Sequence, residues 1–314
     1  MDEECLSKQV SLLMESQLSQ WPTARDNYAA LKTVRLRQFE VEGLTFRVQY
    51  NPARIRSTAA RVDKQSIGQR PCFLCAANRP AEQAAVSFLR RYDILVNPYP
   101  IFPRHLTIAD RSHSPQRLAP RMADMLALAR ELPEFTVFYN GPACGASAPD
   151  HAHFQAGSRG VMPIEREWQP RRGKPIRIGS SRLYLIDDSP RHSLVVVGTR
   201  AEELSDIVAR LLDLLHKDEG EAEPKVNVLA LYEEGLYIVI VLPRRRHRPS
   251  CYFAEGREHL LVSPASVDLG GLIIVPTEED FLKIDARRIR EIVSEVCADR
   301  LSANDVQRLI RSTT

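Results

Sequence analysis

The chain has 314 residues, of which 44% are hydrophobic and 26% charged, and its formal net charge is +3. This composition is typical of a globular protein large enough for one or two domains, and so small a net charge does not by itself indicate a nucleic-acid surface. Because no apolar run approaches the roughly 20 residues of a membrane helix and the acidic start MDEECLSKQV has no secretory signal core, we expect a cytoplasmic protein.

Helices are predicted over about the first 35 residues, because apolar residues recur at helical spacing in LSKQVSLLMESQL and TARDNYAALKTV. The alternating LTFRVQY (44–50) predicts a strand. After a basic loop, YDILVNPYPIF and HLTIAD predict two strands around a Pro-rich turn. Residues 115–133 have helical spacing, and FTVFYNG (135–141) and HAHFQA predict two more strands.

The second half of the chain repeats this order. RLYLIDD and HSLVVVGT correspond to the strands YDILVNP and HLTIAD, and residues 201–217 correspond to the helix. KVNVLALYEEGLYIVIVLPRRR corresponds to the strands FTVFYNG and HAHFQA. When the two halves are aligned in this way, Asn227 corresponds to Asn140, and IVIVLP stands where the first half has the histidine strand. We expect a helical leader (1–40), a first half (41–170) and a degenerate second half (171–314) that adds further strands and a last helix (278–298).

Six cysteines without an export signal argue against a disulfide framework. Cys72 and Cys75 form a C-x-x-C, whose thiolates can bind a metal with two further N or S ligands. The alternatives are a reduced pair without metal or a redox motif, which usually begins a helix in a βαβ setting that this sequence does not predict. The basic clusters PRRGK (170–174) and RRRHR (244–248) are interpreted as solvated loops.

The stretch PDHAHFQAG (149–157) carries the strongest functional signal. On a strand, His151, His153 and Gln155 would project from the same face. A neutral imidazole with one free nitrogen is a nucleophile toward phosphorus, and it works best when a carbonyl holds its other N–H. A nearby Gln can donate to a phosphoryl oxygen in the transition state. The alternative is an ordinary strand whose histidines are hydrogen-bonded or metal-bound.

CFLCAAN, HLTIA and FYNGPACGASAPDHAHFQA, in that order, resemble the histidine-triad superfamily. The nearest match is its transferase branch: galactose-1-phosphate uridylyltransferase, dinucleoside-polyphosphate phosphorylases and GDP-L-galactose (GDP-hexose) phosphorylase. The resemblance implies that His153 becomes nucleotidylated and that Gln155 stabilises the transferred phosphoryl group. Gln155 stands where hydrolytic members have a third His, which favours transfer. Asn140 and Ser147 align with residues that hold phosphate.

Other positions in the resemblance bear on the substrate. Arg54 and Arg56, in NPARIRS, are either phosphate contacts or exposed charges. The uridylyltransferase has Pro where this chain has Ala152, and Asp150 also lies outside its pattern. These two departures disfavour a UDP-hexose.

The resemblance also implies a ligand set for the metal: Cys72, Cys75, His105 and His151, with His113 as an alternative fourth ligand. Two Cys and two His would close a tetrahedral zinc site, or hold iron in the same place. The metal would therefore be structural and would pin the Cys loop to the strand of His153.

Together these observations predict an α+β protein with two tandem histidine-triad-like halves, each an antiparallel sheet with helices against it, forming a pseudo-dimer within one chain. The expected activity is nucleotidyl transfer from an NDP-sugar or dinucleoside polyphosphate to phosphate or a sugar phosphate, by a monomer or homodimer. The alternatives are a hydrolase of nucleotide conjugates and a non-catalytic, zinc-stabilised nucleotide-binding protein.

Overall fold

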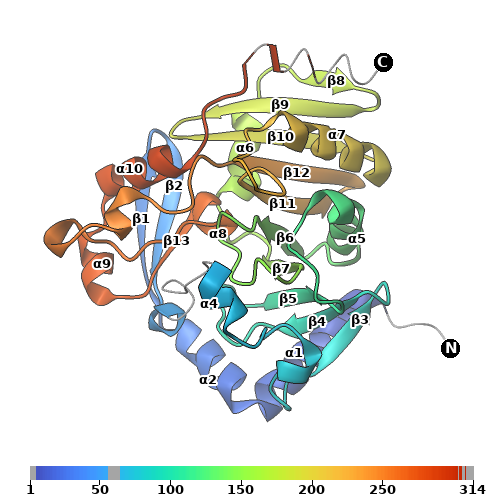
Figure 1. Ribbon diagram of the computed structural model, residues 1–314, viewed down its shortest axis with the longest axis vertical. Coiled ribbons are helices and arrows are strands. Elements are labelled where there is room, and N and C mark those ends of the chain that lie inside the picture. The colour runs from blue at the N-terminus through green and yellow to red at the C-terminus, as the bar shows by residue number, and fades with distance from the viewer. Residues whose placement is uncertain (1–4, 56–63, 303, 306–307, 309–314) are drawn as a thin grey trace.

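The computed structural model describes residues 5–55, 64–302, 304–305 and 308 (Figure 1). Within these residues, no helix combines the length and the apolar character needed to cross a bilayer. Ten strands form one antiparallel sheet: β3 (Ala85–Phe88), β4 (Tyr92–Val96), β5 (His105–Asp110), β6 (Phe135–Asn140), β7 (His153–Ser158), β8 (Ile176–Ile178), β9 (Ser181–Asp188), β10 (Arg191–Gly198), β11 (Val226–Glu233) and β12 (Leu236–Pro243).

The order of the strands in this sheet confirms the predicted repeat. From the centre outward, the first half runs β6-β7-β5-β4-β3 and the second half β11-β12-β10-β9-β8. β12 thus takes in its half the place that β7 takes in the first, as the sequence predicted. The halves join through β6 and β11, where Asn140 lies directly opposite Asn227. The two halves therefore share one continuous sheet.

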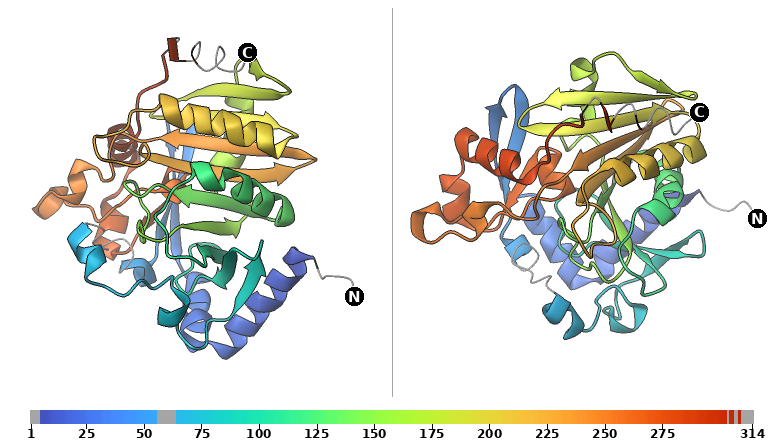
Figure 2. Two further views of the ribbon diagram at one scale, coloured as in Figure 1. Left: turned by 45° about the vertical axis from the view of Figure 1, so that its right-hand side comes forward. Right: turned by 45° about the horizontal axis from the view of Figure 1, so that its top comes forward.

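Helices cover one face of the sheet. They are α1 (Leu6–Gln20), α2 (Pro22–Leu31), α5 (Met122–Glu131) and α7 (Ala201–Leu214). In each half one helix, α5 or α7, connects the third strand to the fourth, and the two lie side by side (Figure 2). The buried side of α7 carries Leu204, Ile207, Val208 and Leu211, the spacing of one helix face. These side chains join strand residues such as Phe154 and Val239 in one core.

A second layer, which the sequence did not predict, covers the other face over the second half. β1 (Arg35–Val41) is a strand, although it begins within the leader (1–40) that was expected to be helical. It pairs with β2 (Leu44–Tyr50), and β2 pairs in parallel with β13 (Leu272–Val275). Phe46 and Val48 on β2 pack in one core with Leu229 and Ile240 of the large sheet. The layer is completed by α6 (Ile164–Arg171), α8 (Ser266–Leu269), α9 (Glu278–Lys283) and α10 (Ala286–Val296).

Two predicted helices are shorter than expected. The helix over 278–298 is divided into α9 and α10 by two residues with extended backbone: Ile284 (φ −70°, ψ 133°), which ends α9, and Asp285 (φ −139°, ψ 179°). The Asp285 carboxylate then accepts the Arg288 N–H at 2.8 Å and begins α10 as an N-cap. In the predicted helix 115–133, only residues 122–131 are α-helical, and a short 3₁₀ turn precedes them.

Candidate active site and metal centre

Strand β7 lies between β5 and β6, and its two faces differ in chemistry. Phe154 and Ala156 point into the core beneath the helices. His153 and Gln155 point the other way and line a cleft of about 950 Å³, part of which is open to solvent. The sequence placed His151 on the same face, and this was wrong. His151 precedes the strand, and its ring lies against the thiols of Cys72 and Cys75 instead.

His153 is held as a neutral imidazole. Its Nδ1 lies 2.8 Å from the His151 carbonyl oxygen, so Nδ1 carries the proton and Nε2 carries the lone pair. Burial lowers the pKa of His153 to about 4. The buried Gln116, which sequence reasoning missed, holds the backbone of His153 on both sides. Its Oε1 accepts the His153 N–H at 2.8 Å, and its Nε2 donates to the His153 carbonyl at 3.0 Å.

Gln155 is oriented by a second histidine. The Ile101 N–H donates to His105 Nδ1 at 3.2 Å, so His105 Nε2 carries the proton and donates to Gln155 Oε1 at 3.0 Å. Burial lowers the pKa of His105 to about 3, so its ring is also neutral. With its oxygen engaged, Gln155 presents its –NH₂ group as a donor in the cleft that His153 lines.

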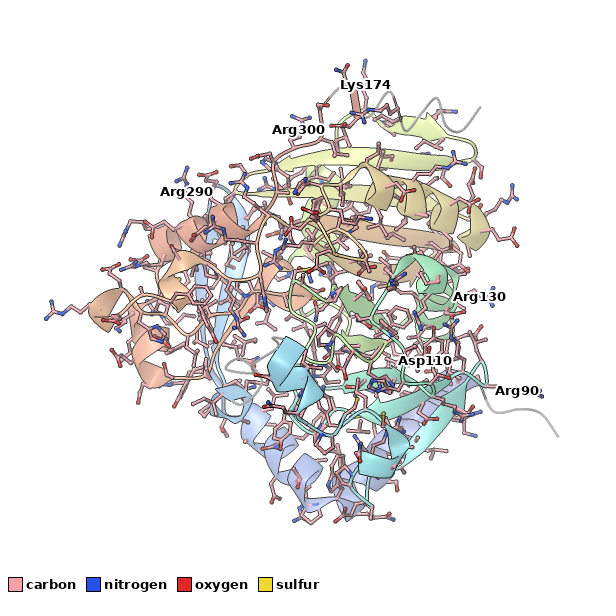
Figure 3. The ribbon with its side chains drawn as sticks, in the orientation of Figure 1. Arg90, Asp110, Arg130, Lys174, Arg290 and Arg300 are labelled. Carbon is pink, nitrogen blue, oxygen red and sulfur yellow. The ribbon has the colours of Figure 1, made fainter. Side chains whose placement is uncertain are left out.

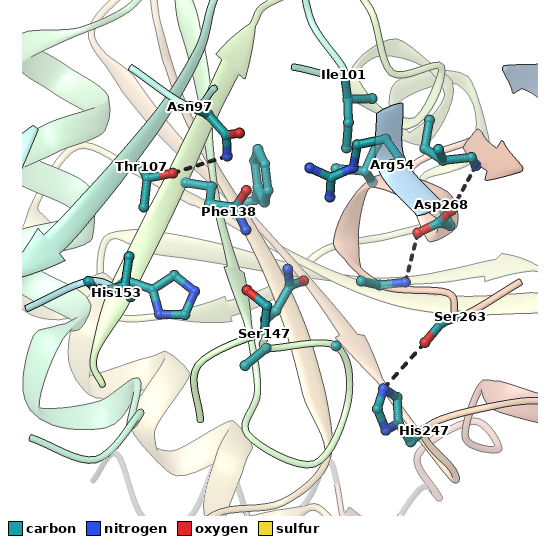
Figure 4. A pocket seen from close by; sticks show the side chains of 18 of the residues that line it. Arg54, Asn97, Ile101, Thr107, Phe138, Ser147, His153, His247, Ser263 and Asp268 are labelled. Atoms are coloured by element: carbon teal, nitrogen blue, oxygen red, sulfur yellow. Dashed lines mark hydrogen bonds between the residues drawn. The ribbon is translucent and has the colours of Figure 1, made fainter. Parts of the chain in front are cut away.

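Three other predicted site residues line the same cleft: Arg54, Asn140 and Ser147. Figure 4 labels Arg54, Ser147 and His153 in this cleft. The Asn140 Oδ1 accepts from Asn227 Nδ2 at 3.0 Å and from the Ser266 hydroxyl at 2.6 Å, which leaves its –NH₂ group to donate. Arg54 donates to the Tyr99 carbonyl at 2.8 Å, and burial lowers its pKa to about 10. Arg56 lies outside the described residues.

The loop between β6 and β7 carries Ser147 and passes close to Ala265, another residue that lines the cleft. Gly145 in this loop has a φ of +111°, and a Cβ there would lie 2.6 Å from the Cβ of Ala265. Glycine alone satisfies both the backbone angle and the close approach. Arg70, from the segment before the Cys pair, donates to the Ser147 carbonyl at 2.6 Å. The loop that carries Ser147 is thus tied to the segment before the Cys pair.

Four side chains beside this cleft are arranged as metal ligands: Cys72, Cys75, His113 and His151, whose ligand atoms all lie within 4.8 Å of one another. The Cys72 Sγ is 3.2 Å from His151 Nδ1, and the Cys75 Sγ is 3.2 Å from His113 Nδ1. Sulfur and nitrogen atoms bound to one tetrahedral ion at roughly 2.3 and 2.0 Å lie about 3.5 Å apart. The cluster therefore fits a zinc-sized ion.

The orientation of His151 supports this assignment. Its Nε2–H donates at 2.7 Å to the carbonyl of Asp110, the last residue of β5. Figure 3 labels Asp110. Nδ1 is thereby left deprotonated toward the thiols, which is the arrangement that a metal-binding histidine needs. His113 Nε2 lies 3.5 Å from the Asp150 carboxylate.

His105, which the resemblance had implied as a ligand, is not part of this cluster. Both of its ring nitrogens are engaged by Ile101 and Gln155, as described above. His113, the alternative from the sequence, takes the fourth place instead. The reason is the turn after β5, where the Ala152 N–H donates to the Ser114 carbonyl at 2.7 Å and brings His113 beside His151.

Comparisons with known proteins place this geometry in context. Residues 13–158 match a family described as a domain of unknown function, DUF4922. The comparison with curated proteins gives no match. Among solved structures, yeast Ap4A phosphorylase Apa2 is similar with a TM-score of 0.61 and 16% identity, over 91% of this chain and 99% of that one. Its complex with Ap4A gives a TM-score of 0.66 and 15% identity, over 96% and 100%.

Its complex with AMP gives a TM-score of 0.56 and 15% identity, over 92% of this chain and 98% of that one. Similarity that extends over nearly the whole of both chains shows that this protein has the histidine-triad-like α+β fold predicted from its sequence.

Proposed function

We propose that this protein is a nucleotidyltransferase that acts as a phosphorylase on a dinucleoside polyphosphate or an NDP-sugar, through a covalent nucleotidyl-His153 intermediate. The observation that carries the proposal is the pair of oriented side chains on β7. His153 presents the lone pair of Nε2, and Gln155 presents an –NH₂ donor, in one cleft with Asn140 and Ser147. The similar yeast enzyme, solved with Ap4A and with AMP, supports a nucleotide as ligand.

The chemistry proceeds in two displacements at the α-phosphorus. In the first, His153 Nε2 attacks, the bond from the α-phosphorus to the bridging oxygen breaks, and the leaving phosphate takes the electron pair. In the second, an oxygen of the acceptor phosphate attacks, and the P–N bond electrons return to Nε2. The proton stays on Nδ1 throughout and donates to the His151 carbonyl oxygen. Gln155, Asn140 and Ser147 would hold the phosphoryl oxygens, where charge shifts in the transition state.

A structural metal belongs to this proposal. Cys72, Cys75, His113 and His151 would hold zinc, or iron in the same site, as a closed ligand set without an open position. The metal when bound would cross-link the Cys loop to the segment before β7. The side chains of the cleft alone would carry out the chemistry.

A hydrolase and a non-catalytic nucleotide-binding protein remain the two alternatives, and one feature of the site argues against each. Hydrolysis is disfavoured by Gln155, which stands in place of a third His. A binding module has no need of a nucleophile held as one tautomer. Added phosphate separates hydrolysis from phosphorolysis, because a phosphorylase should release a nucleoside diphosphate and turn over faster as phosphate is raised.

The decisive test is isolation of the intermediate. Wild-type protein is incubated with Ap4A or an NDP-sugar labelled at the α-phosphate, without acceptor, and should acquire an acid-labile, base-stable label on His153. His153→Ala should acquire no label, and its turnover should fall by several orders of magnitude. The control is His216→Ala, which changes an exposed histidine beyond α7. Turnover by an unlabelled wild type, together with full activity of His153→Ala, would contradict the proposal.

A further inference from the structure

The basic segment 244–248, which follows β12, was interpreted from the sequence as a solvated loop, but its first residue is buried. Arg244 is 5% exposed. Arg245 and Arg246, in contrast, form ion pairs with half-exposed side chains. A buried arginine needs partners for its charge and for its N–H groups. Those partners show what Arg244 does in this protein.

The guanidinium of Arg244 is fully engaged within the protein. It donates to five acceptors: the Asn227 Oδ1 and the carbonyls of Pro264, Arg246, His247 and Val296. A guanidinium has five N–H groups and no acceptor, so each N–H group of Arg244 has a partner. Arg244 is therefore not available to a ligand, and it can affect the cleft only through the groups that it holds.

Asn227 is the side chain among these acceptors, and Arg244 fixes which way its amide points. Asn227 is fully buried on β11, directly opposite Asn140 on β6 (Figure 1). Because a guanidinium can only donate, the Asn227 atom that faces Arg244 must be Oδ1. The Asn227 –NH₂ group then donates to Asn140 Oδ1 at 3.0 Å and to the Cys144 carbonyl, in the loop that carries Ser147, at 2.9 Å.

The orientation of Asn140 follows by the same reasoning. Its Oδ1 accepts from the Asn227 –NH₂ group and from the backbone N–H of Ser266, which is 3.0 Å away. Both of these groups can only donate, so the oxygen of Asn140 is fixed toward them. Asn140 lines the cleft with His153, and its –NH₂ group is the one left for a ligand. A chain of hydrogen bonds between buried side chains thus runs from Arg244 to the cleft.

We propose that Asn227 and Arg244 are positioning residues, which hold Asn140 as a hydrogen-bond donor to the phosphoryl group that is transferred to His153. The inference rests on the proposed function and adds what the second half contributes to it. Asn227 takes in the second half the place that Asn140 takes in the first. An amide held in this way need not reorient when charge shifts onto the phosphoryl oxygens, whereas a reversed amide would present its own oxygen to them.

The experiment measures the first-order rate at which His153 is labelled, at a saturating concentration of whichever of Ap4A and an NDP-sugar labels the wild type. Asn227→Asp keeps the size of the side chain and still accepts from Arg244, but it turns an oxygen toward Asn140 Oδ1. The repulsion should displace or reverse the Asn140 amide and lower the rate by roughly 10- to 100-fold. Asn227→Ala, which adds no repulsion, should lower it by roughly 3- to 10-fold.

A double variant separates positioning from a general effect on the fold. Asn140→Ala should by itself lower the labelling rate by roughly 10²-fold, as expected when one transition-state donor is lost. Adding Asn227→Asp to Asn140→Ala should then change the rate by less than about threefold, because residues that act as a unit are not additive. The control is Arg245→Met, which removes an outward cation next to Arg244 and should behave as wild type. Denaturant unfolding of each variant shows that it is folded.

The outcomes distinguish this inference from the proposed function. If neither Ap4A nor an NDP-sugar labels the wild type, the proposed function fails and the inference with it. If the wild type is labelled but Asn227→Asp is labelled equally fast, the positioning role alone is refuted. The same holds if Asn227→Asp slows labelling as much in Asn140→Ala as in the wild type. Should Asn227→Asp not fold, Asn227→Ala is judged in the same cycle by the same two criteria.

Discussion

The same face of the large sheet is polar on β7 and apolar on β12, although the two strands hold equivalent places in the two halves. On β7 it carries His153 and Gln155, and on β12 it carries Ile238, Ile240 and Leu242. Because the two strands hold equivalent positions in the sheet, their position does not explain this difference in polarity. We attribute it to the layer that lies over each strand.

Over β12 lies the layer built on β1, β2 and β13, and its side chains fill the space above Ile240. A histidine there would lose water without finding a partner, at a cost of several kcal/mol. Over β7 the space is the cleft. The Gln155 side-chain oxygen is hydrogen-bonded to His105, and His153 is hydrogen-bonded to the His151 carbonyl and to Gln116. The comparison teaches that a repeated strand keeps its polar residues where the covering layer leaves a cleft open.

The largest predicted effect concerns the Cys–His cluster, which lies in the first half. His113→Ala should reduce bound zinc or iron from about one equivalent to almost none and lower the free energy of unfolding by several kcal/mol, since binding energy of a structural metal is folding energy. His105→Ala should keep the metal. Elemental analysis and denaturant unfolding measure both. Loss of metal from His105→Ala, with His113→Ala unchanged, would restore the ligand set first implied by the sequence.

A second prediction tests the two strands directly. Ile240→Ala should lower the free energy of unfolding by about 2–5 kcal/mol, because it leaves a cavity in a fully buried site. His153→Ala on the cleft face should lower it by about 1 kcal/mol or less, the size of one hydrogen bond. Urea unfolding of both variants makes the comparison. Equal losses would show that the cleft face is packed as tightly as the covered face.

The third prediction concerns catalysis. Gln155→Ala should lower kcat by roughly 10²-fold, because one hydrogen bond to the transition state is lost. The affinity for the nucleotide substrate should change little. His105→Ala should lower kcat by roughly tenfold, because Gln155 then loses the bond that orients it. The double variant should be no slower than Gln155→Ala, since the two act as a unit. The matched control is His192→Ala, because His192 lies near the start of β10 in the second half as His105 lies at the start of β5 in the first. This variant should not change kcat.

The smallest effect is on the pH dependence of stability. The folded-state pKa of His105 is about 3, well below its ordinary value, so the unfolded chain binds a proton as pH falls through 6.5 while the folded chain does not. Stability is therefore lost on acidification. Between pH 7.5 and 5.5 this histidine should remove about 1.4 kcal/mol. Denaturant unfolding at both pH values should show that the free energy of unfolding of His105→Gln falls by about 1.4 kcal/mol less than that of the wild type. Equal decreases in the two proteins would contradict this prediction.

The sequence was informative wherever a local pattern decides the structure. Alternation predicted β2 and the central strands, helical spacing predicted α7, and the order of elements predicted the repeat. The Cys pair and the histidine strand could be recognised because their residues are close along the chain. The sequence therefore indicated which residues to consider as a candidate site, and it indicated that a carbonyl could hold one N–H of the imidazole; the structure identifies that nitrogen as Nδ1 of His153.

What the sequence could not show depends on contacts between distant segments. β13 pairs with β2 although more than half of the chain separates them, so no local signal announces that layer. The choice of His113 over His105 depends on how the chain turns after β5. Arg244 looks like a surface charge by itself, and only its partners near Pro264 and Val296 make it a buried residue.

The junction of β6 and β11 has a consequence for synthesis of the protein. All six residues of β6 are buried in the finished fold, yet the strand that covers one of its edges is translated only after α7. Until then, a nascent chain emerging from the ribosome presents an open, apolar strand edge. The first half should therefore depend on chaperones, and a chain truncated at residue 170 should aggregate although it contains every residue of β7.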